Sequence, residues 1–133
     1  MAKYVYPAVF YAETEGGYSV IFPDIDGCYT QGETMAEALE AAEDALALML
    51  YDAEEAERKI PSPSNILDIA VEKGAIVSLV HCDTIEYRKF FSNKAVKKTL
   101  TIPQWLNTLA ERQEVNFSAV LQNALKLELN ITD

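Results

Sequence analysis

Residues 96–102 constrain the fold more than any other stretch of this chain. Lys97, Thr99 and Thr101 alternate along it and share one face, which is wholly polar. The opposite face is apolar except for Lys98; its other members are Val96, Leu100 and Ile102. This period of two predicts a half-buried β-strand. A lone strand leaves its edges unpaired, and no partner strand is evident nearby. The simplest partner is therefore the same strand of a second copy of the chain.

Two short helices are predicted directly after this strand. Pro103 suits the first turn of a helix, because its missing N–H would have no partner there in any case. Apolar residues then recur at helical spacing at Trp105, Leu106, Leu109 and Ala110. Asn116 is a suitable N-cap for the last helix. That helix can bury Phe117, Val120, Leu121, Ala124, Leu125 and Leu127. So much apolar surface on two short helices indicates a dimer core.

The order of strand, helix and helix resembles the ribbon-helix-helix family of DNA-binding repressors. In that family two antiparallel strands enter the major groove as a ribbon. The resemblance implies that Lys97, Thr99 and Thr101 face base edges. It also implies that backbone N–H groups of Phe117 and Ser118 hold a phosphate. The remaining residues expected to contact DNA are Lys94, Lys98 and Asn116.

The turn between the two helices departs from the family pattern. Glu114, Val115 and Asn116 stand where a glycine is common. A helical hairpin that serves only for dimerisation is the alternative interpretation of the same residues. The two interpretations differ in whether the polar strand face meets DNA.

The charge of the chain is unevenly distributed. The formal net charge is −10 at pH 7, which is unusual for a protein that binds DNA. Residues 1–92 hold 17 acidic and 6 basic residues, whereas residues 93–133 hold 4 acidic and 5 basic residues. Basic residues gather before and within the predicted strand, at Arg88, Lys89, Lys94, Lys97 and Lys98. The acidic part would repel DNA but attract a basic partner.

The first part of the chain predicts an α+β domain. Its expected order is strand, strand, strand, helix, strand, at residues 4–12, 18–22, 28–31, 35–57 and 75–81. The first three strands are expected to be antiparallel, with the helix packed across one face of the sheet. The last strand is apolar enough to be internal. A sheet of this kind leaves an open face or edge where a partner can dock.

The long helix has a clear start and a strongly acidic composition. Thr34 and Glu37 form a capping box. The expected buried stripe consists of Met35, Leu39, Ala42, Leu46 and Met49 or Leu50. No basic residue occurs between its start and Arg58. The acidic residues form either a solvated face or a surface for a basic protein. The predicted division is a first domain at 1–83, a linker at 84–95 and a second domain at 96–133.

Residues 20–50 resemble the HicB family of antitoxins. The resemblance lies in Phe22-Pro23-Asp24-Ile25-Asp26-Gly27-Cys28, then Thr30-Gln31-Gly32-Glu33-Thr34, then Glu37-Ala38. The order of such a domain before a ribbon-helix-helix is also that of HicB. The resemblance implies a partial ribonuclease H-like first domain and a small basic messenger-RNA-cleaving toxin, HicA, as partner. The antitoxin would also repress the shared operon as a homodimer formed through residues 96–129, and a tetramer is a possible larger assembly. The residues expected to face the toxin are Asp24, Asp26, Glu37, Glu40 and Asp44.

Catalysis is the less favoured hypothesis. Asp24 and Asp26 could belong to a metal-dependent nuclease, but they flank one residue of a turn where Asp is common for backbone reasons. His81 ends an apolar strand without an evident catalytic partner. We therefore expect that the protein is not an enzyme and binds no cofactor. A further alternative is a stand-alone ribbon-helix-helix regulator whose acidic domain senses a ligand or a protein.

The remaining composition points to a cytoplasmic protein. Cys28 and Cys82 lie far apart, and without a secretion signal they favour reduced thiols. A single histidine and the absence of a Cys-x-x-Cys pattern argue against a metal site. No apolar run reaches the roughly 18 residues that a membrane-spanning helix needs.

Overall fold

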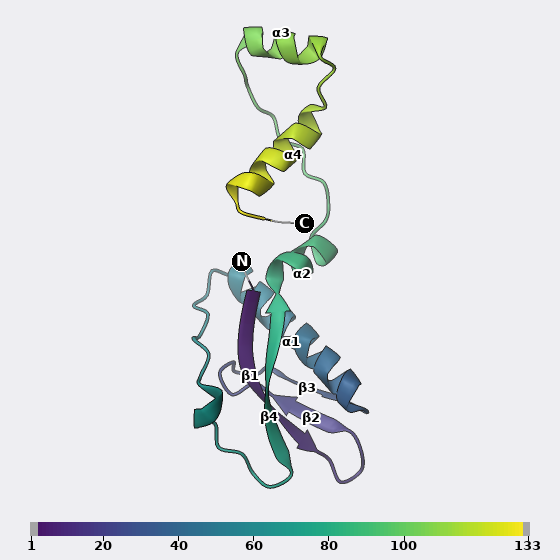
Figure 1. Cartoon of the computed structure of the whole chain (residues 1–133), viewed down its shortest axis with the longest axis vertical. Helices are drawn as coiled ribbons and strands as arrows, with labels where there is room; N and C mark the ends of the chain where they lie inside the picture. The colour runs from purple at the N-terminus through teal and green to yellow at the C-terminus, as the bar shows by residue number, and fades with distance from the viewer. Residues whose placement is uncertain (1–2, 132–133) are drawn as a thin grey trace. The chain divides into compact units, whose positions relative to one another are not determined.

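The computed structural model describes residues 3–131 of the chain, which divides into two units at residues 94 and 95 (Figure 1). The first unit holds a sheet, the long helix α1 and the short helix α2. The second holds helices α3 and α4. No helix within residues 3–131 is both long enough and apolar enough to cross a membrane.

The first unit is built on a four-stranded antiparallel sheet in the order β3-β2-β1-β4. Its strands are β1 (Lys3–Ala12), β2 (Tyr18–Ile21), β3 (Tyr29–Gly32) and β4 (Ala75–Asp83). The predicted order of strands along the chain is confirmed. The prediction that the last strand is internal is wrong, because β4 pairs only with β1 and forms an edge. Its apolar character instead leaves exposed side chains at Ile76 and Leu79.

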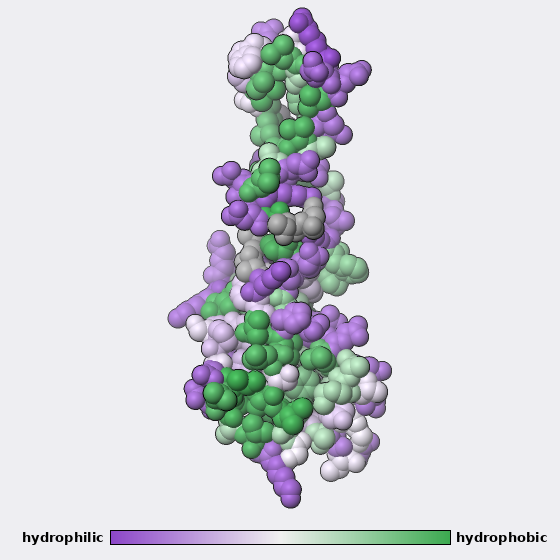
Figure 2. All heavy atoms as spheres, viewed as in Figure 1, coloured by the Kyte–Doolittle hydropathy of each residue, from purple (hydrophilic) through white to green (hydrophobic). Residues whose placement is uncertain are grey.

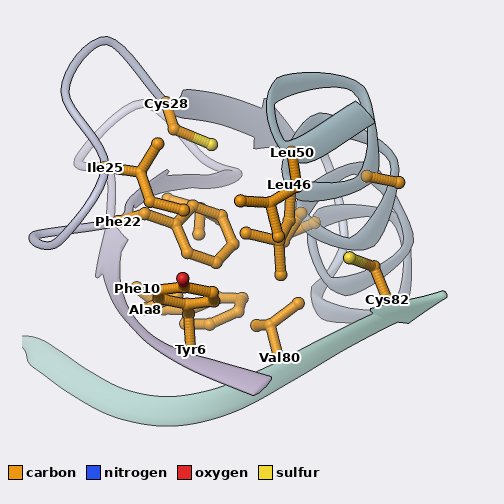
Figure 3. Close-up of a cluster of buried hydrophobic side chains, with 14 residues drawn as sticks. Tyr6, Ala8, Phe10, Phe22, Ile25, Cys28, Leu46, Leu50, Val80 and Cys82 are labelled. Atoms are coloured by element: carbon orange, nitrogen blue, oxygen red, sulfur yellow. The ribbon is translucent and has the colours of Figure 1, made fainter. Parts of the chain in front are cut away.

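Helix α1 (Met35–Glu55) covers one face of this sheet. Figure 3 shows Leu46 and Leu50 of α1 directed toward the side chains that the strands contribute to the core. The residues that the strands and the loop after β2 contribute to the core are Tyr6, Ala8, Phe10, Val20, Phe22, Ile25, Cys28, Val80 and Cys82. Burying a large apolar side chain contributes roughly 1.5–3 kcal/mol, so this cluster provides the main stabilisation of the unit.

The start of α1 follows the predicted capping box. The Thr34 hydroxyl accepts a hydrogen bond from the Glu37 N–H at 3.1 Å, and the Glu37 carboxylate accepts one from the Glu33 N–H at 3.1 Å. Immediately before it, a Cβ on Gly32 would lie 2.4 Å from the backbone nitrogen of Ala38. Only glycine therefore allows the first turn of α1 to lie this close to β3.

The predicted buried stripe of α1 is partly wrong. The buried residues are Ala38, Ala42, Leu46, Ala47, Leu50 and Ala53. Met35 and Leu39, which were expected in the core, are exposed. Small residues at the start of the stripe let α1 approach the sheet closely. The larger apolar side chains at positions 35 and 39 consequently lie beside this contact and not within it.

The segment between α1 and β4 contains a short 3₁₀ helix, η1 (Ile66–Asp68), which lies against β4. The Tyr6 hydroxyl donates a hydrogen bond to the Pro61 carbonyl. The Asp24 carboxylate accepts hydrogen bonds from both the N–H of Ser64, at 2.9 Å, and its hydroxyl. These contacts tie the segment to β1 and to the loop after β2.

Residues 84–91 form the helix α2 (Thr84–Phe91), so the prediction of a linker over 84–95 is wrong for this part. The Asp83 carboxylate caps α2 by accepting a hydrogen bond from the Ile85 N–H at 2.9 Å. The helix packs against the end of α1, where the rings of Tyr51 and Tyr87 lie 5.0 Å apart. Its partners lie some 30 residues away in sequence, which is why its own composition does not reveal it.

The second unit consists of α3 (Gln104–Arg112) and α4 (Phe117–Glu128). The predicted N-cap of α4 is confirmed: the Asn116 side chain accepts a hydrogen bond from the Ala119 N–H at 3.0 Å. Glu114 adopts a φ of +54° in the turn, a conformation usually taken by glycine. Residues 96–102 form no strand in this single chain, so their pairing with a second copy stays a prediction.

Candidate functional site

The residues expected to contact DNA are accessible in the second unit and just before it. Lys94, Lys97, Lys98, Thr99 and Thr101 are all exposed. They precede α3 in a stretch without regular secondary structure, so their alignment as one face is not imposed by the single chain. The structure therefore leaves their side chains free to meet a partner.

The start of α4 contains Phe117 and Ser118, whose N–H groups are expected to hold a phosphate. Phe117 and Ser118 are exposed and belong to the first turn. Their N–H groups precede the first backbone bond of the helix, from Val120 to Asn116 at 3.0 Å. The Asn116 side chain already accepts a hydrogen bond from the Ala119 N–H. The two N–H groups ahead of it are those that a helix start normally offers to a phosphate.

The second unit carries apolar surface that it does not bury itself. Neither α3 nor α4 contains a buried residue. The exposed large apolar side chains of the two helices are Trp105, Leu106, Leu109, Phe117, Val120, Leu125 and Leu127. A unit of about 40 residues with an uncovered core normally needs a second chain for stability.

The five acidic residues expected to face a toxin fall into two groups. Asp24 holds Ser64, and Glu37 completes the cap of α1, so both carboxylates stabilise the fold. Asp26, Glu40 and Asp44 are exposed, and within residues 3–131 they make no hydrogen bond or ion pair. The fold itself makes no use of the carboxylates of the second group, and the toxin contacts of all five residues stay a prediction.

A buried carboxylate that sequence reasoning missed joins α1 to two other elements, β1 and α2. The Glu54 carboxylate accepts hydrogen bonds from the Tyr4 hydroxyl at 2.8 Å, the Thr84 hydroxyl at 2.9 Å and Arg88 Nη2 at 3.0 Å. Burial alone would raise the pKa of Glu54, but hydrogen bonds, these three among them, outweigh burial and lower the pKa to about 2. The charged form is therefore part of the native fold. Nothing in the local sequence distinguishes Glu54 from the acidic residues around it.

A groove lies between α1, the end of β4 and α2. Its volume is about 840 Å³. Apolar side chains on its wall include Leu48, Phe90 and Phe91, and acidic ones include Asp44. His81 also lines it, with Nε2 3.7 Å from a Glu43 oxygen. Of the five acidic candidates, only Asp44 lines this groove.

The two cysteines belong to the core. Cys28 and Cys82 are buried free thiols. Burial raises the pKa of Cys28 to about 11, and burial with nearby acidic groups raises that of Cys82 to about 12. Thiols protonated to this degree are poor nucleophiles and poor metal ligands. Among the described side chains, no three of His, Cys, Asp and Glu gather in a metal-binding cluster.

Comparison with known proteins places this architecture in one family. Residues 6–124 match the family model described as the HicB-like antitoxin of bacterial toxin-antitoxin systems. The chain belongs to the HicB-like antitoxin family. The antitoxin HicB of Escherichia coli K12 is 46% identical over 69 residues, which cover 50% of each protein. This HicB-like chain thus spans about half the length of the curated relatives that it matches first.

Solved structures of toxin-antitoxin complexes extend the match over more of the chain. A chain of a toxin-antitoxin complex from Streptococcus pneumoniae is 31% identical, with a TM-score of 0.62, and the match covers 95% of this chain and 99% of that one. A chain of the HicA3 and HicB3 toxin-antitoxin complex is 29% identical, with a TM-score of 0.51, over 60% of this chain and 99% of that chain. The α+β fold class expected from the sequence is confirmed.

Proposed function

We propose that this HicB-like antitoxin neutralises a small, basic, messenger-RNA-cleaving toxin of the HicA type through its first unit. We propose also that it represses its own operon by binding operator DNA as a dimer through its second unit. The observation that carries the proposal is the separation of charge and surface between the units. The first is acidic and folded around its own core, whereas the second has equal numbers of acidic and basic residues and leaves its apolar side chains uncovered.

The proposal that the first unit neutralises a toxin rests on carboxylates that the fold itself does not use. Asp26, Glu40 and Asp44 are exposed on an acidic unit, which favours association with a positively charged protein. By covering a toxin surface that would otherwise hold RNA phosphate, the first unit would block cleavage sterically and electrostatically. The proposal requires no catalytic step by the antitoxin and no cofactor. The operator DNA and the messenger RNA that the toxin would cleave both lie inside the cell, so we propose that the antitoxin acts in the cytoplasm.

Rescue of cells from the toxin tests the toxin half. We expect that co-expression of residues 1–94 alone restores growth, because this segment includes α2 and all contacts of Glu54 described above. A chain ending at Asp83 lacks α2 and should rescue poorly. Failure of residues 1–94 to rescue, when the full chain does, would show that the first unit is insufficient.

The proposal of DNA binding rests on the exposed apolar side chains of the second unit. A second copy can pair its residues 96–102 with those of the first and bury the apolar sides of α3 and α4, forming a ribbon-helix-helix. Lys97, Thr99 and Thr101 would then project together from one face of the paired strands. The start of α4 would hold a backbone phosphate.

Fluorescence anisotropy over a salt series tests the DNA half. The duplex upstream of the antitoxin gene is compared with a scrambled duplex. We expect Lys97→Ala to weaken specific binding by about 1–3 kcal/mol if Lys97 contacts a base. If it contacts only phosphate, the loss is similar for both duplexes and the salt slope falls by about one. Lys59→Ala, an exposed lysine of the first unit, is the matched control. Binding unchanged by a triple Lys97, Thr99 and Thr101 substitution to Ala contradicts the proposal.

A tetramer is the larger assembly that we propose, with the edge of β4 as the second contact. Residues 75–82 of this edge strand contain no Asp, Glu, Lys or Arg. Natural edge strands are usually protected by charges, proline or bulges. Two acidic units meeting along this edge would avoid placing like charges opposite each other. Figure 2 shows apolar side chains gathered over β1 and β4 on the face away from α1. Leu79→Lys should reduce a tetramer to a dimer in light scattering.

A further inference from the structure

The groove between α1, the end of β4 and α2 combines exposed aromatic side chains with a rigid support. Phe90 and Phe91 are 79% and 63% exposed. The Phe91 ring packs on Tyr87 with 4.5 Å between centroids, and the Phe90 ring meets Phe91 edge-on at 4.7 Å. Arg88 ties the same helix to Glu54 and Glu55. The two phenylalanines are therefore held in place without being buried.

The opposite wall of the groove is also apolar, and its rim is acidic. Leu48 of α1 is 52% exposed and lines the same cavity. Glu43 and Asp44 come from the turn of α1 that precedes it. Glu40, four residues before Asp44, extends the acidic side along the helix, since residues at this spacing are neighbours on a helix surface. His81 is the one basic side chain among the lining residues described, and it lies 3.7 Å from Glu43.

These features favour one kind of occupant. Exposed aromatic and leucine side chains in a cavity are suited to an apolar anchor from a partner. Carboxylates beside that cavity favour lysine or arginine next to the anchor. The face of the sheet away from α1 has apolar side chains too, but its edge strand β4 offers no acidic residue before Asp83. The groove, in contrast, has Glu43 and Asp44 on its wall, so its charge is complementary to that of a basic protein.

We propose that this groove is the toxin-docking site of the antitoxin. An apolar side chain of the toxin enters between Leu48 and the pair Phe90 and Phe91, and a neighbouring lysine or arginine meets Asp44 and Glu43. This inference rests on the proposed toxin-neutralising function and adds the surface that performs it. It places α2, and not the loop of Asp24 and Asp26, at the centre of the interface.

Isothermal titration of the full-length antitoxin with the HicA-type toxin encoded beside its gene tests the site. The toxin is separated from its complex in denaturant and refolded. The double variant Leu48→Ser/Phe90→Ser removes two exposed groove side chains. We expect its dissociation constant to rise roughly 30-fold or more. Asp44→Lys should also weaken toxin binding, because it replaces attraction by repulsion. The loss of affinity should be larger at low salt than at high salt.

Matched controls lie elsewhere on the same unit. Leu67→Ser alters a leucine of η1 that is 87% exposed, and Glu72→Lys alters an exposed acid that lies outside the groove and is not among the residues expected to face the toxin. Neither should change toxin affinity by more than about twofold, and circular dichroism melting should show all variants folded.

The possible outcomes separate this inference from the proposed function. Toxin binding that is lost in the groove variant and kept in the controls supports the docking site. Equal affinity of the wild type and the groove variant overturns the site while toxin binding itself stands. No binding by the wild type refutes the proposed function and the site with it. A groove variant that changes only the oligomeric state shows that a second copy of this chain occupies the groove, which also overturns the inference.

Discussion

Replacing Glu54 with Gln should destabilise the first unit far more than the same change at its neighbour Glu55. The Glu54 side chain is 6% exposed and accepts hydrogen bonds from three residues, one on β1 and two on α2. Gln keeps one acceptor oxygen but loses the charge and turns an amide N–H₂ toward donors. Glu55 meets the same Arg88, but its side chain is 52% exposed. The pair of variants thus separates a buried ion pair from an exposed one.

The magnitude follows from the pKa of Glu54, which is lowered from 4.5 to about 2. At about 1.4 kcal/mol per pH unit, this difference corresponds to about 3 kcal/mol of stability at pH 7. We expect Glu54→Gln to cost about 2–3 kcal/mol, and Glu55→Gln less than about 1 kcal/mol because exposed pairs contribute little.

The cost of Glu54→Gln should also depend on pH. A carboxylate whose pKa is lower in the folded state stabilises the fold above its unfolded pKa, and this contribution is lost as pH falls toward the folded pKa. For Glu54 the loss occurs between about pH 4.5 and pH 2. At pH 3 the stabilisation should be about 1.5 kcal/mol, so the difference between wild type and variant shrinks by about 1.5 kcal/mol relative to pH 7.

Urea denaturation with two probes measures this in the intact chain. All seven tyrosines lie in residues 4–87, and the single tryptophan is Trp105. Near-ultraviolet circular dichroism of tyrosine therefore follows the first unit, and tryptophan fluorescence follows the second. With a urea slope of about 1–3 kcal/mol/M, the tyrosine midpoint should fall by about 1–2 M in Glu54→Gln at pH 7. Equal midpoints for the Glu54 and Glu55 variants, or a cost that stays constant down to pH 3, would refute the reasoning.

Three further predictions concern the same unit. Thr34→Ala should lower the free energy of unfolding by about 1 kcal/mol, measured in urea, because α1 loses its N-cap hydrogen bond. Leu46→Ala should cost about 2–5 kcal/mol in the same assay, whereas Leu48→Ala, at an exposed position, should stay within about 0.5 kcal/mol. Cys28 and Cys82 should resist iodoacetamide at pH 8 in the native protein and react quickly in urea, as mass spectrometry would show; rapid native alkylation would contradict their burial and raised pKa.

The sequence predicted those parts of the fold that local signals determine. The β-β-β-α-β order follows from alternation, turn residues and a capping box, all of which act within a few residues. Gly16 and Gly17 adopt positive φ in the first turn, and Thr34 caps α1, as their types indicate. The edge position of β4 could not be predicted in this way, since strand order depends on contacts between distant segments.

The sequence predicted that acidic residues form the candidate site, but it did not predict which acidic residues are available for it. Acidic residues of the first unit were expected to face a toxin, yet Asp24 and Glu37 are engaged in hydrogen bonds that stabilise the fold. Sequence alone does not distinguish such a carboxylate from a free one such as Asp44. The groove was missed because α2 was interpreted as linker, and its wall consists of elements from separate parts of the chain.

The acidic character of α1 explains why α2 is a fixed helix. Carboxylates near the C-terminus of a helix oppose its dipole, and the last turn of α1 contains no basic residue. Arg88 supplies the missing positive charge from α2, with Nη2 3.0 Å from Glu54 and Nη1 on Glu55. Neutralising this end of α1 therefore fixes the position of α2 on it. The same contact leaves Phe90 and Phe91 exposed beside Leu48, so the groove follows directly from the way the chain compensates its own acidic helix.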